Sequence, residues 1–116
     1  MSVLIFAESN NGKFNKATLE VASYAKAIAS SLGTSLSAVA INANNSEILA
    51  QYGVEKVLNV NNTSLENFNG LAYADVIKQA AEKEDAKVVI VSQSADSKYL
   101  APLLRIMFLP LQIIFS

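Results

Sequence analysis

Residues 3–33 read VLIFAESNNGKFNKATLEVASYAKAIASSLG and contain the first repeat of a pattern that recurs along the chain. Residues 3–7 are a short apolar run that does not alternate with polar residues, which is typical of a parallel strand buried on both faces. After the polar residues 8–13, apolar residues recur at helical spacing as far as Leu32, and Gly33 favours a left-handed end to that helix. The stretch therefore predicts a strand, a polar loop and a helix.

The same pattern repeats along the chain. Short apolar runs at residues 36–41, 56–60 and 87–92 predict three more strands, and residues 46–53, capped by Ser46, and 73–80 predict helices. The order βαβαβαβ predicts an α/β domain with a doubly wound parallel sheet and helices on both faces.

Composition narrows the classes of function. Of 116 residues, 52% are hydrophobic and 16% are charged, which suits one compact domain. The net charge of −1 and the lack of a basic stripe argue against a nucleic-acid partner. The absence of Cys and His removes thiolate nucleophiles, the usual zinc ligands and the commonest general base. The amino terminus has no basic region before its apolar run, so we expect a cytoplasmic protein.

A strand order of 3-2-1-4 would place a switch point between the first and fourth strands, where such folds bind ligands. The loops at residues 8–13 and 92–98 flank that crevice, and the binding residues predicted there are Glu8, Ser9, Ser92, Ser94 and Asp96. Glu8 and Asp96 are the one carboxylate pair that could act as acid and base. The alternative is that Asp96 caps a helix and Glu8 is a solvated or interface side chain. We expect no catalytic residue and no metal site.

The loop AESNNGKF, residues 7–14, is similar to a phosphate-binding loop but lacks two of its parts. Ala7 stands where a first glycine would let the backbone wrap a phosphate, and Phe14 stands where a Ser or Thr would hold magnesium. Glu8 would also repel a pyrophosphate at the strand end. We therefore expect no nucleotide to bind through this loop.

Two segments carry a likeness to a known family. In residues 3–20 a strand ends in Ala7-Glu8 and is followed by Gly12-Lys13 and an Ala-rich helix; in residues 92–104 a loop leads into the segment YLAPLL. Together with YGVEKV at residues 52–57, these segments resemble the N-terminal domain of the alpha subunit of electron-transfer flavoproteins. The likeness covers residues 1–104.

The resemblance implies an electron carrier and not an enzyme. In that family an alpha and a beta subunit form a heterodimer that takes electrons from flavoprotein dehydrogenases, such as those of fatty acid beta-oxidation, and passes them to a downstream acceptor. The resemblance also implies that the N-terminal alpha domain has a nucleotide-binding-like fold, of the adenine nucleotide alpha hydrolase-like type, and packs against the beta subunit. FAD is held mainly by the C-terminal alpha domain. The likeness covers no FAD-contacting position, so we expect FAD in the full-length parent subunit and none on this chain alone.

Residues 105–116 form an apolar tail that does not match the family's continuation, as expected of a truncated or frame-shifted subunit. We therefore divide the chain into the alpha N-terminal α/β domain, 1–104, and a divergent tail, 105–116. A membrane span needs about 20 apolar residues. The tail is shorter and is interrupted by Pro110, so we expect no stable membrane insertion.

The tail has two alternative placements. Residues 111–115 form a substitute fifth strand beside the fourth, or the tail stays exposed and promotes association. Because the family's next strand is missing, we expect the backbone groups and apolar surface of residues 88–91 to be exposed. Pro102 lacks an N–H group and is tolerated only in a first helical turn, so the last helix must begin near Tyr99.

Two other functions stay open on the sequence. The first is a free-standing nucleotide- or small-molecule-binding α/β module, although residues 93–97 contain no glycine to cradle a phosphate. The second is an interaction domain whose apolar tail and helix faces dock on a partner. Fold alone does not choose among these functions, because this architecture hosts many.

Overall fold

The computed structural model describes residues 2–92, 99–107 and 112–115. The elements in chain order are β1 (Ser2–Phe6), β2 (Ser9–Asn10), β3 (Lys13–Phe14), α1 (Lys16–Ser31), β4 (Ser35–Ile41), η1 (Ser46–Tyr52), β5 (Lys56–Val60), η2 (Thr63–Leu65), α2 (Gly70–Lys83), β6 (Ala86–Val91), α3 (Leu100–Met107) and β7 (Gln112–Phe115). The elements η1 and η2 are 3₁₀ helices.

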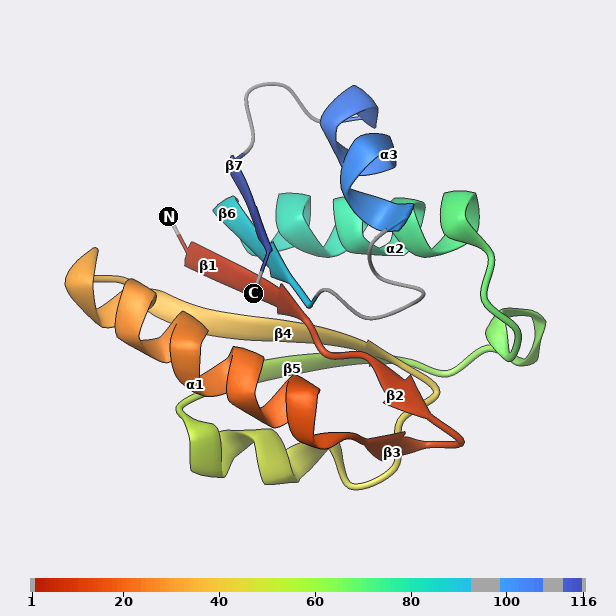
Figure 1. Ribbon diagram of the computed structural model, residues 1–116, viewed down its shortest axis with the longest axis horizontal. Coiled ribbons are helices and arrows are strands. Elements are labelled where there is room, and N and C mark those ends of the chain that lie inside the picture. The colour runs from red at the N-terminus through yellow and green to blue at the C-terminus, as the bar shows by residue number, and fades with distance from the viewer. Residues whose placement is uncertain (1, 93–98, 108–111, 116) are drawn as a thin grey trace.

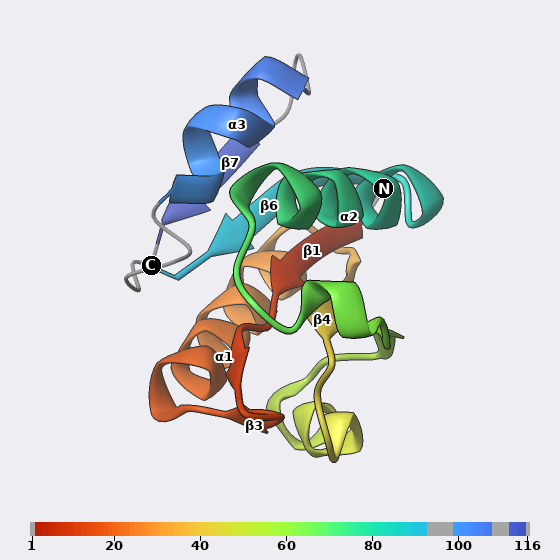
Figure 2. The ribbon, with the colours of Figure 1, turned by 90° about the vertical axis from the view of Figure 1, so that its right-hand side faces the viewer.

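The main sheet has the strand order β5-β4-β1-β6-β7, and all neighbouring strands run parallel (Figure 1). The predicted doubly wound α/β fold is therefore confirmed, and its first four strands have the order 3-2-1-4 on which the switch-point prediction was conditional. Seen from the side in Figure 2, α1 and η1 lie on one face and α2 and α3 on the other. A layer of helices on each face is what a buried parallel sheet requires.

Strand β1 shows why its sequence does not alternate. Val3 and Ile5 belong to the core under α1, whereas Leu4 and Phe6 belong to the core under α2 and α3. Both faces of the strand are therefore apolar. On the α1 side, the helix contributes Ala22, Ala25 and Ala29, whose small side chains are fully buried and let the helix lie close to the sheet.

Two predicted helix starts need correction. Ser46 does not cap η1: Asn45 precedes the helix with φ of 53° and makes no side-chain capping bond. Helix α2 begins at Gly70, earlier than expected, because the side chain of Asn69 accepts a hydrogen bond from the Ala72 N–H at 3.1 Å and so starts the helix there. As predicted, Gly33 has a left-handed φ, of 66°, after α1.

The C-terminal elements complete the sheet. Strand β7 pairs with residues 88–91 of β6, so the unpaired edge expected there is wrong and the substitute-strand alternative holds for Gln112–Phe115. Helix α3 starts at Leu100, as Pro102 requires, and its Leu100 and Leu104 are fully buried in the core under α2 and α3. Position 111 lies outside the described residues, and the division of the chain after residue 104 stays a prediction.

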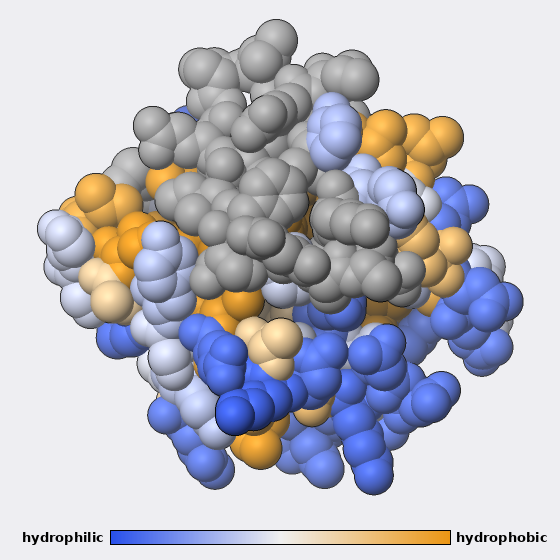
Figure 3. Space-filling model, in the orientation of Figure 1, coloured by the Kyte–Doolittle hydropathy of each residue, from blue (hydrophilic) through white to orange (hydrophobic). Residues whose placement is uncertain are grey.

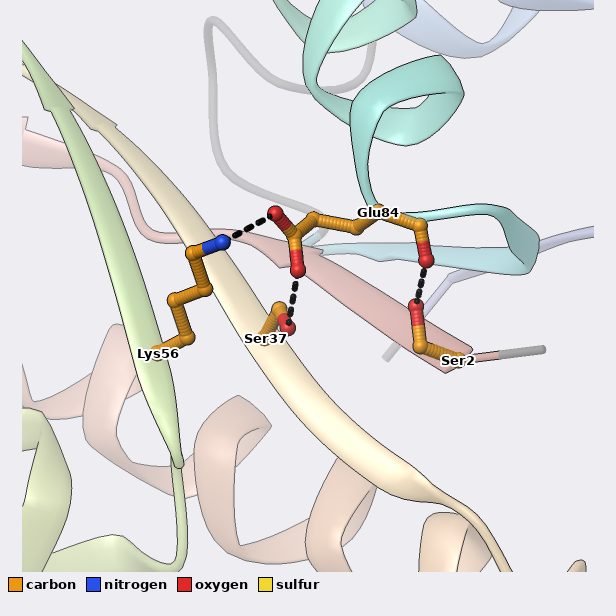
Figure 4. Close-up of polar contacts among 4 residues, drawn as sticks. All are labelled: Ser2, Ser37, Lys56 and Glu84. Carbon is orange, nitrogen blue, oxygen red and sulfur yellow. Dashed lines mark hydrogen bonds and ion pairs between the residues drawn. The ribbon is translucent and has the colours of Figure 1, made fainter.

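A polar cluster closes the amino end of the sheet (Figure 4). The carboxylate of Glu84, at the end of α2, lies 2.9 Å from the Lys56 ammonium and accepts a hydrogen bond from the Ser37 hydroxyl at 3.4 Å. Its main-chain carbonyl accepts a hydrogen bond from the Ser2 hydroxyl at 2.7 Å. One residue thereby ties α2 to β1, β4 and β5.

Candidate functional site

A small hairpin stands at the carboxyl end of β1. Strands β2 and β3 pair antiparallel across a two-residue turn, in which Asn11 and Gly12 have φ of 52° and 82°. Positive φ at both turn residues is the pattern of a type I′ hairpin, for which Asn-Gly is the preferred sequence. The sequence analysis treated residues 8–13 as a polar loop and missed the hairpin, although the Asn-Gly pair was the signal for it.

Backbone contacts hold the hairpin against the end of β4. The Ser9 hydroxyl donates to the Ile41 carbonyl at 3.2 Å, and the Asn44 N–H donates to the Gly12 carbonyl at 2.7 Å. A Cβ atom on Gly12 would lie only 2.4 Å from the Asn44 side-chain nitrogen. Glycine is therefore needed here both for its backbone conformation and for the close approach of the two loops.

The opposite wall comes from the segment between β5 and α2. Asn42, with φ of 52°, pairs with the backbone of Asn62: its amide nitrogen donates to the Asn62 carbonyl, and its amide oxygen accepts from the Asn62 N–H. The Tyr73 hydroxyl donates to the Leu65 carbonyl at 2.7 Å. The Tyr73 ring also meets Phe68 edge-on, with ring centres 5.0 Å apart. These contacts fix the loop that faces the hairpin.

Two adjoining hollows lie between these walls. The larger has a volume of about 510 Å³ and the smaller about 190 Å³. Both are lined by Ser9, Asn11, Ile41, Glu66 and Tyr73. The larger adds Gly12, Asn42, Asn44, Leu65 and Asn67, and the smaller adds Phe6, Glu8, Asn10 and Phe68. We call the two together the polar groove.

Acidic and amide side chains line the polar groove in the described part of the chain. Its described lining contains the carboxylates Glu8 and Glu66 and no lysine or arginine. Glu8 is buried, and the Thr18 hydroxyl donates to its main-chain carbonyl at 2.6 Å, which ties the strand end to α1. Within the described part of the chain, no group of three His, Cys, Asp or Glu residues could hold a metal ion. The arrangement suits the binding of hydrogen-bonding groups.

The structure places the predicted site residues in different surroundings. Glu8 and Ser9 line the polar groove, and Ser92 is buried just after β6, outside the described lining of the groove. Ser94 and Asp96 lie outside the described residues, and so does any approach of Asp96 to Glu8. The residues that the sequence analysis missed are Asn11, Asn42, Asn44, Glu66, Asn67 and Tyr73. Most of them come from loops whose contacts depend on chain segments distant in sequence.

A second, apolar hollow lies between α2 and the edge strand β5. It has a volume of about 520 Å³ and is lined by Val39, Val57, Leu58, Asn59, Val60, Val76, Gln79, Ala80 and Lys83. Leu58 and Val60 are only partly buried, because α2 covers the middle of the sheet and leaves the β5 side of this face less protected.

None of the helices in the described part of the chain has the length and apolar character of a membrane-spanning helix.

By its architecture the chain is a doubly wound α/β domain with a polar groove at the carboxyl ends of its strands. A solved protein of the universal stress protein family from Burkholderia pseudomallei has the same fold, with a TM-score of 0.57 and 12% identity over 97% of this chain and 94% of that one. The model of the electron transfer flavoprotein domain matches residues 3–104. The chain therefore belongs to the electron transfer flavoprotein domain family, and its relatives identify it as an alpha-subunit N-terminal domain.

Curated relatives agree with that family. The electron transfer flavoprotein alpha subunit of Thermoanaerobacterium thermosaccharolyticum is 30% identical over 103 residues, and that of Clostridium acetobutylicum is 29% identical over the same length. Protein FixB of Clostridium saccharobutylicum is 29% identical over 102 residues. Each match covers 86% of this chain, and the chain spans 30–31% of the length of these relatives.

Proposed function

We propose that this chain works as the N-terminal domain of an electron-transfer flavoprotein alpha subunit. With a beta subunit, it would carry electrons from flavoprotein dehydrogenases, including those of fatty acid beta-oxidation, to a downstream acceptor in the cytoplasm. The observation that carries the proposal is the match of the family model to residues 3–104, together with alpha subunits that align with 86% of the chain. Its own role would be to dock and not to catalyse.

In this proposal FAD belongs to the parent subunit and not to this chain. A pyrophosphate needs hydrogen-bond donors and positive charge around it. The described lining of the polar groove instead brings two carboxylates and no lysine or arginine. The groove is thus a poor place for the FAD pyrophosphate, which supports a docking role for the domain.

The test is to express the chain with and without an electron-transfer flavoprotein beta subunit, using a tag on this chain, and to record mass in solution and visible absorption. We expect a colourless chain that captures the beta subunit. One control is Ile5→Asp, which puts a charge at a fully buried position in the central strand and should abolish both folding and capture. The matched permissive control is Glu47→Gln on the exposed side of η1, which should capture as well as the parent chain.

The two parts of the proposal fail separately. A yellow chain with bound flavin would overturn the placement of FAD elsewhere in the subunit. A folded chain that leaves the beta subunit uncaptured would overturn the docking role and favour the free-standing binding module.

A further inference from the structure

Four polar side chains of the larger hollow are unused by the fold. Asn11, Asn44, Glu66 and Asn67 line it, and all four are exposed. Within the described residues none of these side chains makes a hydrogen bond or an ion pair, whereas the neighbouring Asn42 uses both ends of its amide on the backbone of Asn62. Three amides and one carboxylate are therefore available to a ligand from the same hollow.

The charge of the hollow selects the ligand. Glu66 is the one charged residue in its described lining, with no lysine or arginine to balance it, so phosphates and carboxylates are disfavoured. An ionised carboxylate only accepts hydrogen bonds and has two oxygens, which fits two neighbouring hydroxyl groups. An amide both donates and accepts, which fits the other hydroxyl and ring-heteroatom groups of the same molecule.

Size and shape agree with a small ligand. The volume of about 510 Å³ falls within the range of about 300 to 1,000 Å³ that is common for small-molecule sites. The Tyr73 ring lines both hollows, so a ligand in the larger hollow has an aromatic surface beside it. The Tyr73 hydroxyl is held by the Leu65 carbonyl, and this bond keeps the ring in place.

We propose that the polar groove binds a neutral molecule with a vicinal diol, such as a sugar or the ribose of a nucleoside. Glu66 accepts hydrogen bonds from the two hydroxyls, and Asn11, Asn44 and Asn67 contact the rest of the ligand. The proposal is independent of electron transfer and of the beta subunit. It differs from phosphate binding, because the groove recognises hydroxyls and repels anions.

The experiment is a titration of the isotope-labelled full chain, followed by amide chemical shifts. The probes are ribose, adenosine, 2′,3′-dideoxyadenosine and adenosine monophosphate, each up to about 10 mM, a range that detects millimolar affinity. We expect adenosine to shift the amides of residues 9–12, 42–44 and 65–67. Dideoxyadenosine, which lacks the diol, and the monophosphate, which adds negative charge, should each bind about tenfold more weakly or worse.

Comparison of ribose with adenosine distinguishes the source of the diol. If ribose and adenosine cause chemical-shift changes of equal size, the groove is a sugar site. If adenosine binds more strongly than ribose, it is a nucleoside site. Both results support the proposal. Equal binding of adenosine and dideoxyadenosine, or an absence of shifts around the groove with ribose and adenosine alike, would overturn it.

A pair of variants tests the role of Glu66. Glu66→Gln keeps the shape and removes the charge, and it should weaken adenosine binding about tenfold. Glu47→Gln changes an exposed glutamate outside the groove and should leave binding unchanged. The undisturbed amide spectrum of Glu66→Gln without ligand serves as its folding check. Unchanged affinity in that folded variant would rule out the carboxylate as the diol receptor.

Discussion

The two ends of the parallel sheet use the same kinds of side chain in opposite ways. At the amino end, Glu84 is held by Lys56 and Ser37, and its side chain is 12% exposed. At the carboxyl end, Glu66 and Asn67 face a hollow, exposed and without hydrogen bonds from their side chains among the described residues. Figure 3 shows hydrophilic surface at the lower right, around the hairpin and η2. A carboxylate with its partner belongs to the fold, and one without a partner is available for binding.

The largest expected effect is at the carboxyl end, in the wall beneath the polar groove. Phe6 is 3% exposed, lines the smaller hollow and meets the Tyr73 ring edge-on at 6.0 Å. Phe6→Ala should lower the free energy of unfolding by about 3–5 kcal/mol, because it leaves a cavity under the site. Urea denaturation followed by circular dichroism measures this. Phe6→Leu, the control that keeps more of the apolar volume, should lower the free energy of unfolding by less than Phe6→Ala does; an equal loss in both variants would contradict the cavity explanation.

The next effect tests the closed amino end. Glu84→Ala should lower the free energy of unfolding by about 1–3 kcal/mol, because it removes an ion pair and a hydrogen bond. This value lies below that of a fully buried ion pair, because Lys56 is half-exposed and solvent screens its charge. The control is Glu82→Ala, whose pair with Lys78 is on the surface and should contribute about 0.3–0.5 kcal/mol. Equal effects of the two substitutions in urea denaturation would show that the Glu84 cluster adds no stability beyond a surface pair.

A smaller effect separates backbone conformation from side-chain bonding at the groove wall. Asn42→Ala loses two hydrogen bonds to Asn62 and places a less tolerant residue at φ of 52°, so it should cost about 1–2 kcal/mol of unfolding free energy. Asn42→Gly loses the same bonds but adopts that φ readily, and it should cost less. Thermal unfolding of the two variants measures the difference. A glycine variant no more stable than the alanine variant would assign the whole effect to the bonds.

The smallest effect defines what is free for binding. Glu66→Ala should change the free energy of unfolding by less than about 0.5 kcal/mol, since the side chain is exposed and makes no described hydrogen bond or ion pair. The measurement is the midpoint of urea denaturation beside the parent chain. A loss as large as that of Glu84→Ala would erase the contrast between the two ends and give Glu66 a structural role.

Most of the sheet could be predicted because its strands are buried on both faces. The runs at residues 56–60 and 36–41 match β5 and β4 within one residue, whereas the order of the first four strands entered only as a condition that the structure then meets. Right-handed crossovers restrict the strand order but do not select one. The predicted binding positions Glu8 and Ser9 do line the groove. Glu66 and Asn67 could not be found this way, since an exposed polar residue in a loop has no pattern in sequence.

The C-terminal elements also show a limit of prediction from sequence, here for an apolar segment. The apolar tail allowed two placements, and pairing of β7 with β6 selects one of them. Apolar residues show that a segment favours burial, but the place of burial depends on which edge or face is still unoccupied after the rest has folded. The family likeness, in contrast, is carried by residues 3–20 and 92–104 and is visible in the sequence without the structure.

Sequence alone therefore established the α/β class through its apolar periodicity, which is a local property, and the family resemblance through the segments at residues 3–20, 52–57 and 92–104. The strand order, the close approach of Asn44 to Gly12, the position of Glu66 at the same hollow and the ion pair of Glu84 with Lys56 became known only from the tertiary structure. Those contacts join loops and strand ends far apart along the chain, and their geometry exists only once the two cores have packed around the sheet.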